Sequence, residues 1–398
     1  MARTNDVTVV GGGIIGLTCA YQLACAGIGV TVVDRRTCGS GASWAAPGIL
    51  SAPSPHRSDA MASLQLISLG MYPTFCAELH ERCGIDPEFT PCGSVEVFFE
   101  DQQYRMGLSR ADATEGQVGD DGQPILTMLS ADQIGDVVPG VRSGAMGALL
   151  CRRTAQVRTP RLLRALRASC ESLGVRIIEQ VDPVELMIES GRIAGVQAGV
   201  ETIRCRQAVL SAGAWSSHLR HLDRPVVEVR PVRGQIVLLR CAERPFVPVV
   251  EDRSCYLVPR PDGLVLLGAT VEPEAGFRSR VTAAGISSLI QAGLRLVPAL
   301  AEASVVNMWA GLRPDTPDHR PFIGLVPAVE GLIAATGHHR NGIVLAPVTA
   351  RAVTDLIIRG ATDFDLELCR LDRDVSWPAD TKHPPISNES ASYGRPGR

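Results

Sequence analysis

The chain has 398 residues, of which 45% are hydrophobic, and a net charge of −3, so it can bury a large core or two domains. This charge, without a long basic run, argues against a nucleic-acid partner. Twelve cysteines are scattered without a C-x-x-C pair or metal-ligand spacing. They predict reduced, mostly buried thiols of a cytoplasmic protein rather than a disulfide framework.

The first element is an uncharged stretch that runs from Val7 to Val33. Its length alone would suit a membrane-spanning helix or a secretory signal. Three consecutive glycines, Gly11 to Gly13, argue against a spanning helix, because each costs about 1 kcal/mol in a helix interior. A β-branched run precedes them and a helix-favouring run follows. The pattern predicts a nucleotide-binding strand–helix–strand unit and no membrane span.

Within this unit the motif G-x-G-x-x-G falls on Gly11, Gly13 and Gly16, and Asp34 closes the second strand. The first glycine permits a tight turn, the second lets the backbone approach a pyrophosphate, and the third lets helix and strand pack closely. Asp34 can accept hydrogen bonds from a ribose diol. The two arginines after it could favour an NADP phosphate, although such loop residues are usually just solvated.

The rest of the chain alternates strands and helices around glycine-rich turns. The patterns predict helices over 60–84, 159–173 and 282–296 and from 342 onward, with Thr159 capping the second of them. They predict strands over 93–99, 175–181, 184–189, 192–198, 207–213 and 331–337, further strands between 226 and 305, and a hairpin turn at Ser190–Gly191. Residues 114–124 read as a loop, and the polar, proline-containing tail 381–398 is expected to be disordered.

Four segments carry a resemblance to a known family: GGGIIG, CYLVPR, AGLRPDTPDHRPFIG and GHHRNGIVLAP. From Val7 to about Asp374 the chain resembles the FAD-dependent amino-acid oxidases, which include D-amino-acid oxidase and sarcosine oxidase, and above all the glycine oxidases. The resemblance implies an α/β (α+β) fold, with a Rossmann-like FAD-binding domain and a second, β-rich substrate-binding domain. The implied FAD-binding domain spans 1–85, 146–225 and 306–380, and the substrate domain spans 86–145 and 226–305.

The resemblance also implies which residues hold FAD. Carried over by matched position, they are Gly11, Gly13, Ile14, Ile15, Gly16, Asp34, Arg35, Ala42, Ser43, Pro47, Gly48, Ile49, Val184, Gly213, His338, His339, Arg340, Asn341, Gly342, Ile343 and Val344. Sarcosine oxidases often attach flavin through a cysteine near the segment that here reads VVNMWAGL. Because this segment has no cysteine, we expect non-covalent FAD.

The family's substrate-binding groups fall on Tyr256, Arg313 and Arg340. An arginine fork suits a carboxylate, so Arg313 is expected to hold the substrate carboxylate, with the Tyr256 hydroxyl beside it and the Arg340 carbonyl on the amine. The implied reaction is hydride transfer from the substrate Cα to flavin N5. It gives an imine, which hydrolyses to a keto acid or glyoxylate, while oxygen reoxidises the flavin to give hydrogen peroxide.

Some features leave the function open. Ser254 and Val271 stand where glycine oxidases often show histidine or methionine, which leaves the substrate open among glycine, sarcosine and small D-amino acids. A dehydrogenase that passes electrons to a quinone, or a non-enzymatic flavoprotein, remains an alternative. Because adjacent histidines on a turn do not readily face one ion, His338 and His339 predict no metal site. A homo-oligomer and a role in thiamine thiazole synthesis are left open.

Overall fold

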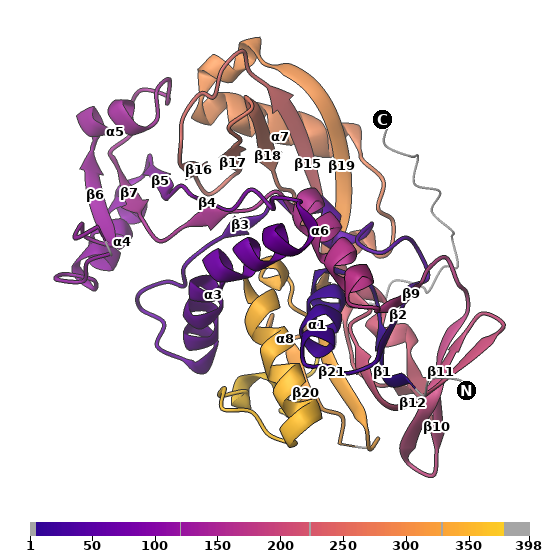
Figure 1. The fold of residues 1–398 in the computed structure, drawn as a ribbon. Coiled ribbons are helices and arrows are strands. Elements are labelled where there is room, and N and C mark those ends of the chain that lie inside the picture. Colours follow the sequence, from indigo (N-terminus) through magenta and orange to yellow (C-terminus); the bar gives the residue numbers. More distant parts are fainter. Residues whose placement is uncertain (1–4, 120, 223, 328, 378–398) are drawn as a thin grey trace.

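Two large β-sheets organise the chain in the computed structural model, which describes residues 5–119, 121–222, 224–327 and 329–377 (Figure 1). The predicted disordered tail lies outside these residues. The first sheet contains β1 (Asn5–Val10), β2 (Val30–Val33), β9 (Arg176–Ile178), β10 (Val184–Glu189), β11 (Arg192–Ala198), β12 (Glu201–Leu210), β20 (Phe322–Leu325) and β21 (Leu332–Thr336). Its strands β9, β2, β1, β12 and β21 pair in parallel in that order.

The carboxyl ends of these parallel strands lie along one edge of the first sheet. Gly11 follows β1, Asp34 follows β2, Ser211 follows β12 and Gly337 follows β21. In open α/β sheets, ligands bind outside this edge. The strand–helix–strand prediction is therefore confirmed, and it places the glycine motif where a dinucleotide would bind.

A layer of helices covers one face of the first sheet and shares a hydrophobic core with β1 and β2 (Figure 1). It consists of α1 (Ile14–Cys25), α3 (Ala60–Cys83), α6 (Thr159–Ser172) and α8 (Gly342–Arg359). One predicted cap is wrong: Arg158, not Thr159, is the N-cap of α6. The Thr159 hydroxyl instead donates to the Ala46 carbonyl at 2.8 Å, so a tertiary contact replaces the local cap.

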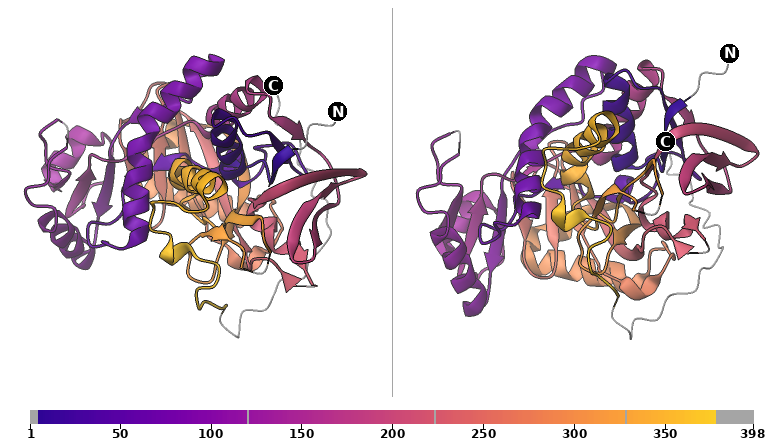
Figure 2. Two further views of the ribbon diagram at one scale, coloured as in Figure 1. Left: turned by 60° about the horizontal axis from the view of Figure 1, so that its bottom comes forward. Right: turned by 90° about the horizontal axis from the view of Figure 1, so that it is seen from below.

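The second sheet has the strand order β19-β15-β18-β17-β16-β5-β7-β6. Its strands are β5 (Ser94–Phe98), β6 (Leu126–Ser130), β7 (Gly147–Cys151), β15 (Arg230–Arg240), β16 (Val249–Glu251), β17 (Tyr256–Pro259), β18 (Leu264–Gly268) and β19 (Ser304–Asp315). The helix α7 (Ala283–Leu296) packs against it, and α4 (Asp101–Asp112) and α5 (Ala131–Val137) contact β6 and β7 at its far end. In both views of Figure 2, this far end and the hairpin β10–β11 lie on opposite sides of the molecule.

The remaining elements are short. They are α2 (Ala42–Ala45), β3 (Ile49–Leu50), β4 (Thr90–Pro91), β8 (Ala155–Gln156), η1 (Gly213–His218), β13 (Arg220–His221), β14 (Arg224–Pro225), η2 (Pro273–Ala275), η3 (Pro298–Glu302) and η4 (Glu367–Cys369). The predicted boundaries at residues 146 and 306 fall beside β7 and inside β19, which both belong to the second sheet. The exact domain division therefore stays a prediction.

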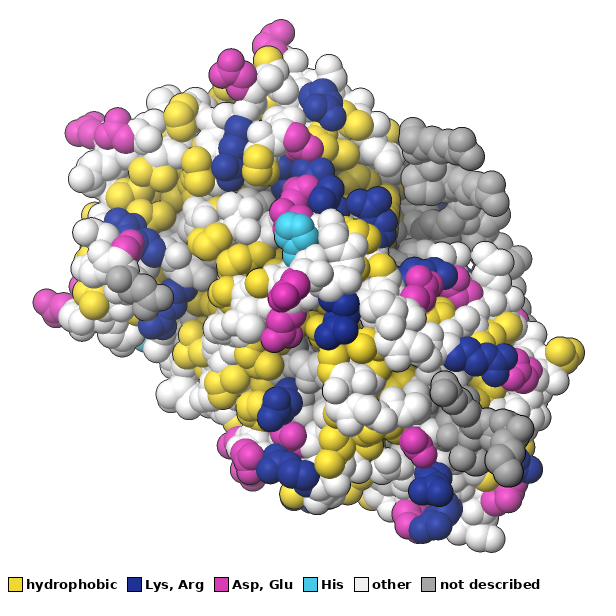
Figure 3. Space-filling model, in the orientation of Figure 1, with side chains coloured by type: hydrophobic (Ala, Val, Ile, Leu, Met, Phe, Trp, Pro, Cys, Tyr) yellow, Lys and Arg dark blue, Asp and Glu magenta, His cyan; other side chains and the backbone are white. Residues whose placement is uncertain are grey.

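Basic and acidic side chains intermix over the face seen in Figure 3. All twelve cysteines are free, and six of them are buried, which is fewer than the sequence predicts. Within the described residues, no helix combines the length and the apolar character that a membrane crossing requires.

Candidate active site

The three glycines of the G-x-G-x-x-G motif lie in and after the turn between β1 and α1, and they differ in how much space surrounds each Cα. A Cβ on Gly11, whose φ is +106°, would lie 2.4 Å from the carbonyl oxygen of Ser211, and one on Gly16 would lie 1.8 Å from that of Gly11. A Cβ on Gly13 would meet only Ser43 Oγ, at 3.2 Å. Gly11 and Gly16 therefore let strands and helix pack, whereas Gly13, the N-cap of α1, is the least crowded of the three and has only the Ser43 side chain near it. This helix N-terminus fits the pyrophosphate of FAD.

Asp34 is held in place by backbone groups of the same turn. Its Oδ2 accepts the Gly12 N–H at 2.7 Å and its Oδ1 accepts the Arg36 N–H at 2.8 Å. Burial raises the pKa of this carboxyl, and the two backbone bonds oppose the rise. Each oxygen keeps a second lone pair, which suits a ribose hydroxyl. Arg35, by contrast, pairs with Asp182 at 3.0 Å on the surface.

The segment 42–50, which contains the short α2 and β3 and is called the loop 42–50 below, is tied to the second sheet. Arg260, only 4% exposed, donates from Nη2 to the Pro47 carbonyl at 2.6 Å. Trp309 of β19 donates from Nε1 to the Ala45 carbonyl at 3.1 Å. These bonds fix a loop that, by the family resemblance, is expected to contact FAD.

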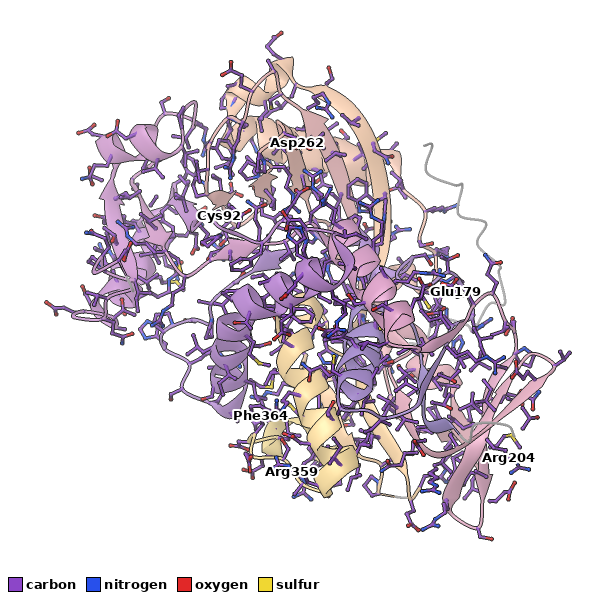
Figure 4. The ribbon with its side chains drawn as sticks, viewed as in Figure 1. Cys92, Glu179, Arg204, Asp262, Arg359 and Phe364 are labelled. Atoms are coloured by element: carbon purple, nitrogen blue, oxygen red, sulfur yellow. The ribbon has the colours of Figure 1, made fainter. Side chains whose placement is uncertain are left out.

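A second link joins the helix layer to the second sheet. Arg158, at the start of α6, forms an ion pair with Asp262 at 2.8 Å. Asp262 lies in the turn between β17 and β18, among the strands of the second sheet (Figure 4). Together with the bonds from Arg260 and Trp309, this pair connects the first-sheet side of the molecule to the second sheet.

The turn after β21 leads into α8 and also contacts β19. His338 is buried with Nε2 3.1 Å from Thr349 Oγ1, and burial lowers its pKa to about 3, so the ring is neutral at pH 7. The His339 N–H donates to the Pro314 carbonyl at 2.8 Å. Burial likewise lowers the pKa of His339 to about 4. This turn therefore lies against the end of β19 that carries Arg313.

Arg313 and Tyr256 occupy gaps that glycines leave in the second sheet. A Cβ on Gly234 would lie 2.3 Å from Nη1 of Arg313, and a Cβ on Gly268 would lie 2.5 Å from the Tyr256 hydroxyl. Nη1 of Arg313 donates to the Thr270 carbonyl at 3.1 Å. Both side chains are half-buried. The glycines, which the sequence analysis did not single out, thus decide where these two polar groups lie.

The three predicted substrate groups influence one another electrostatically. Burial raises the pKa of Tyr256 to about 12, and the positive charges of Arg313 and Arg340 oppose that rise. Burial lowers the pKa of Arg313, and the Arg340 charge acts in the same direction. Tyr256, Arg313 and Arg340 therefore lie near one another, as the sequence predicts, and the tyrosine is protonated at pH 7.

One carboxyl group at this site was not foreseen from the sequence. Glu251 of β16 is paired in register with Tyr256 on one side and with Glu96 on the other, so the three side chains share a face of the sheet. Glu96 forms an ion pair with Arg110. Burial, followed by the charge of Glu96, raises the pKa of Glu251 to about 7.

For two further predicted FAD residues, Val184 and Gly213, the structure gives a position but no contact that bears on FAD binding. Val184 begins β10 and packs near Val33. Gly213, with φ +56°, begins η1 beside Thr336, whose hydroxyl donates to its carbonyl at 3.4 Å. The roles of Val184 and Gly213 stay predictions.

A separate groove of about 550 Å³ between α7 and β19 is lined by none of the predicted site residues.

The nucleotide edge of the first sheet and the arginine-bearing second sheet together define a flavin-dependent oxidoreductase. The family described as FAD dependent oxidoreductase matches residues 6–356. The chain is 36% identical over 356 residues to the glycine oxidase of Pseudomonas putida, which covers 89% of this chain and 94% of that protein. It is 34% identical over 365 residues to the bifunctional protein ThiO/ThiG of a Nostoc species, covering 90% of this chain and 54% of that one.

Solved structures agree with these sequence relatives. The crystal structure of glycine oxidase from Geobacillus kaustophilus matches with a TM-score of 0.87 and 31% identity, over 93% of this chain and 99% of that one. The chain therefore belongs to the FAD dependent oxidoreductase family. The predicted fold class, the cofactor FAD and the oxidoreductase activity are confirmed.

Proposed function

We propose that this chain is an oxidase of small amino acids and amines, with glycine, sarcosine and D-alanine as its substrates and molecular oxygen as the acceptor. The observation that carries the proposal is the Arg313 guanidinium, fixed by the Thr270 carbonyl in the gap at Gly234. A planar, permanently charged fork beside a protonated tyrosine suits an α-carboxylate. FAD held at the first sheet would supply the two-electron oxidant that accepts hydride from the substrate Cα.

The chain's own residues bind and orient the substrate. Arg313 holds the carboxylate through paired N–H donors, and the Tyr256 hydroxyl donates to the same group. The Arg340 carbonyl accepts from the amine. Fixing both ends of a small amino acid aims its Cα–H in one direction, and such positioning accounts for a large part of catalysis in general. Ile49 and Val271 restrict the size of the side chain.

The proposal also includes the FAD contacts, the domain division, the biosynthetic role and the cellular compartment. Non-covalent FAD is held by the β1–α1 turn, Asp34, the loop 42–50 and the turn 338–344. The FAD-binding part follows the first sheet and the substrate-binding part follows the second. The similarity to ThiO/ThiG supports a role in thiamine thiazole synthesis, and we place the enzyme in the cytoplasm.

The test is a comparison of Arg313→Ala and Arg313→Lys with wild type on two kinds of substrate. Losing a charged contact that leaves its partner buried costs about 2–5 kcal/mol. We therefore expect kcat/KM for glycine and sarcosine to fall at least tenfold in Arg313→Ala, with partial recovery in Arg313→Lys. Oxidation of an amine without a carboxylate should fall much less, and hydrogen peroxide should form with each turnover.

Arg240→Ala is the matched control, because Arg240 is an exposed arginine of the neighbouring strand β15. It should leave kcat/KM unchanged. An equal loss for both kinds of substrate in Arg313→Ala would place the carboxylate site elsewhere. Turnover with an artificial electron acceptor but not with oxygen would identify a dehydrogenase instead.

A further inference from the structure

A buried carboxylate with two histidines lies at the end of β19, beside the proposed substrate site. Asp315 is 4% exposed, and its Oδ1 lies 2.7 Å from Nδ1 of His319 and 3.7 Å from Nδ1 of His339. The two imidazole rings stack with centroids 5.1 Å apart. One ligand atom from each of the three residues lies within 4.8 Å of the others. Both histidines thus present the same type of nitrogen to one carboxylate oxygen.

The backbone fixes this arrangement from two separate turns. His319 has φ +60° and His339 has φ +48°, a conformation that non-glycine residues adopt uncommonly. The Thr316 N–H donates to Asp315 Oδ1 at 3.0 Å and orients the carboxylate. The His339 N–H donates to the Pro314 carbonyl and locks the second turn against the first. Strained backbone of this kind concentrates at functional sites.

The side chains around the Asp315 carboxylate are of the kinds that bind metal ions. A buried carboxylate is normally paired with a positive group or coordinates a metal. The ion-pair partners that the described residues offer to Asp315 are His319 and His339, whose Nδ1 atoms both face the same carboxylate oxygen. Imidazole nitrogen is the commonest metal-binding group of protein side chains.

We propose that Asp315, His319 and His339 form a binding site for a divalent transition-metal ion, with Zn²⁺ the best fit. Two imidazole nitrogens and one carboxylate oxygen are ligands that zinc accepts, with a fourth position left for water or an anion. Calcium and magnesium prefer all-oxygen sites, so they fit this set poorly.

To hold such an ion, the three ligand atoms, which lie within 4.8 Å of one another, must adjust their spacing. Zinc–ligand bonds of about 2.0–2.1 Å place two ligands of a tetrahedral ion roughly 3.3 Å apart. The Asp315–His339 distance of 3.7 Å is close to this value, and the Asp315–His319 distance of 2.7 Å must open slightly. The side chain of His319 is 66% exposed and is free to move outward.

The position of the site links metal binding to the proposed substrate groups. Asp315 follows Arg313 by two residues, and His339 directly precedes Arg340. An ion held there would tie together the two segments that carry these arginines. We therefore expect bound zinc to raise the melting temperature of the holoenzyme and to change KM for the amino acid.

The test measures Zn²⁺ binding to the FAD-loaded protein by calorimetry and equilibrium dialysis. Wild type should bind about one Zn²⁺ per chain at this site, and His319→Asn should weaken binding at least about tenfold. Asparagine tolerates a positive φ, so the turn should persist. His80→Asn is the control, because His80 is exposed and lies in the last turn of α3. The other end of this helix, at its N-cap Asp59, is the end that contacts Arg320, 3.9 Å away and next to His319 in the sequence.

Zinc K-edge absorption of the loaded protein separates this site from binding to cysteines. Nitrogen and oxygen ligands at about 2.0–2.1 Å support the proposal, whereas sulfur at about 2.3 Å overturns it. Absence of zinc binding in wild type, or equal binding by wild type and His319→Asn, also overturns it. Asp315→Asn provides a second loss-of-ligand variant, and undiminished zinc affinity in a folded Asp315→Asn protein would contradict the proposal.

Discussion

The guanidinium of Arg313 occupies space that a side chain at residue 234 would need. A Cβ on Gly234 would lie 2.3 Å from Nη1 and 2.6 Å from Cζ of Arg313. The two residues are on the adjacent strands β15 and β19, whose register pairs Gly234 with Gly311. A glycine in a strand interior often marks such a close approach. Here it sets the position of the group proposed to bind the substrate carboxylate.

Gly234→Ala should therefore impair catalysis without affecting the cofactor. The added methyl group forces the guanidinium aside, and displacements of about 1 Å can lower rates by 10². We expect kcat/KM for glycine to fall by ten- to a hundredfold in steady-state assays, with unchanged flavin absorbance. Gly70→Ala in α3 is the control, since its Cβ would meet nothing within 4 Å. Wild-type kinetics in Gly234→Ala would show that the guanidinium position is not critical.

The glycines of the first turn should separate cofactor binding from folding. Gly13→Val places a branched side chain where the phosphate is expected to approach the backbone, and the nearest atom to its Cβ is the side-chain oxygen of Ser43 at 3.2 Å, so FAD affinity should be lost while the apoprotein still folds. Gly16→Ala instead introduces a Cβ 1.8 Å from the Gly11 carbonyl oxygen. Overpacking of this kind typically costs about 1–3 kcal/mol. Thermal melting of both apoproteins and FAD titration measure the two effects, and full flavin content in Gly13→Val would refute the pyrophosphate position.

Local sequence was sufficient for much of the nucleotide edge. The glycine motif, the strand before it, the helix after it and Asp34 lie within one short segment, and their spacing alone predicts the unit. The hairpin turn at Ser190–Gly191 was also predictable from the sequence, because a two-residue turn ending in glycine favours a hairpin. The structure has the positive φ angles that such a turn requires, +51° at Ser190 and +76° at Gly191. Thr159 shows the limit, because its hydroxyl binds the distant Ala46 carbonyl instead of capping α6.

Features that depend on strand register could not be found from the sequence. Gly268 makes room for Tyr256, and Glu251 pairs with that tyrosine, only because β16, β17 and β18 align as they do. The histidines show the same limit. The sequence places His338 next to His339, but the ring that stacks on His339 in the structure is that of His319, which comes from a separate turn.

Arg260 should affect the cofactor from a distance. It is buried and donates from Nη1 to Gln156 Oε1 and from Nη2 to the Pro47 carbonyl, both at 2.6 Å. Arg260→Leu leaves these acceptors without a donor, at a cost of about 1–3 kcal/mol for each buried group, and releases the loop 42–50. We expect a lower melting temperature and weaker FAD binding, measured by calorimetry and flavin titration. Exposed Arg153→Leu should change neither, and wild-type FAD affinity in Arg260→Leu would exclude a role in placing the loop.

Glu251 should make stability fall as pH rises through its raised pKa. Below the ordinary value of 4.5, this carboxyl is protonated in both the folded and the unfolded chain and has no net effect. Between 4.5 and about 7 the unfolded chain ionises first, so unfolding releases a proton and the free energy of unfolding declines with pH.

Glu251→Gln removes that pH-dependent loss. The variant should match wild type near pH 4.5 and exceed it at pH 8 by an amount of the order of 1–3 kcal/mol, since each pKa unit corresponds to about 1.4 kcal/mol. Denaturant unfolding at both pH values measures the difference, with exposed Glu115→Gln as the control. A constant difference between Glu251→Gln and wild type across this range would mean that Glu251 ionises normally and that its surroundings are more polar than its position beside Tyr256 indicates.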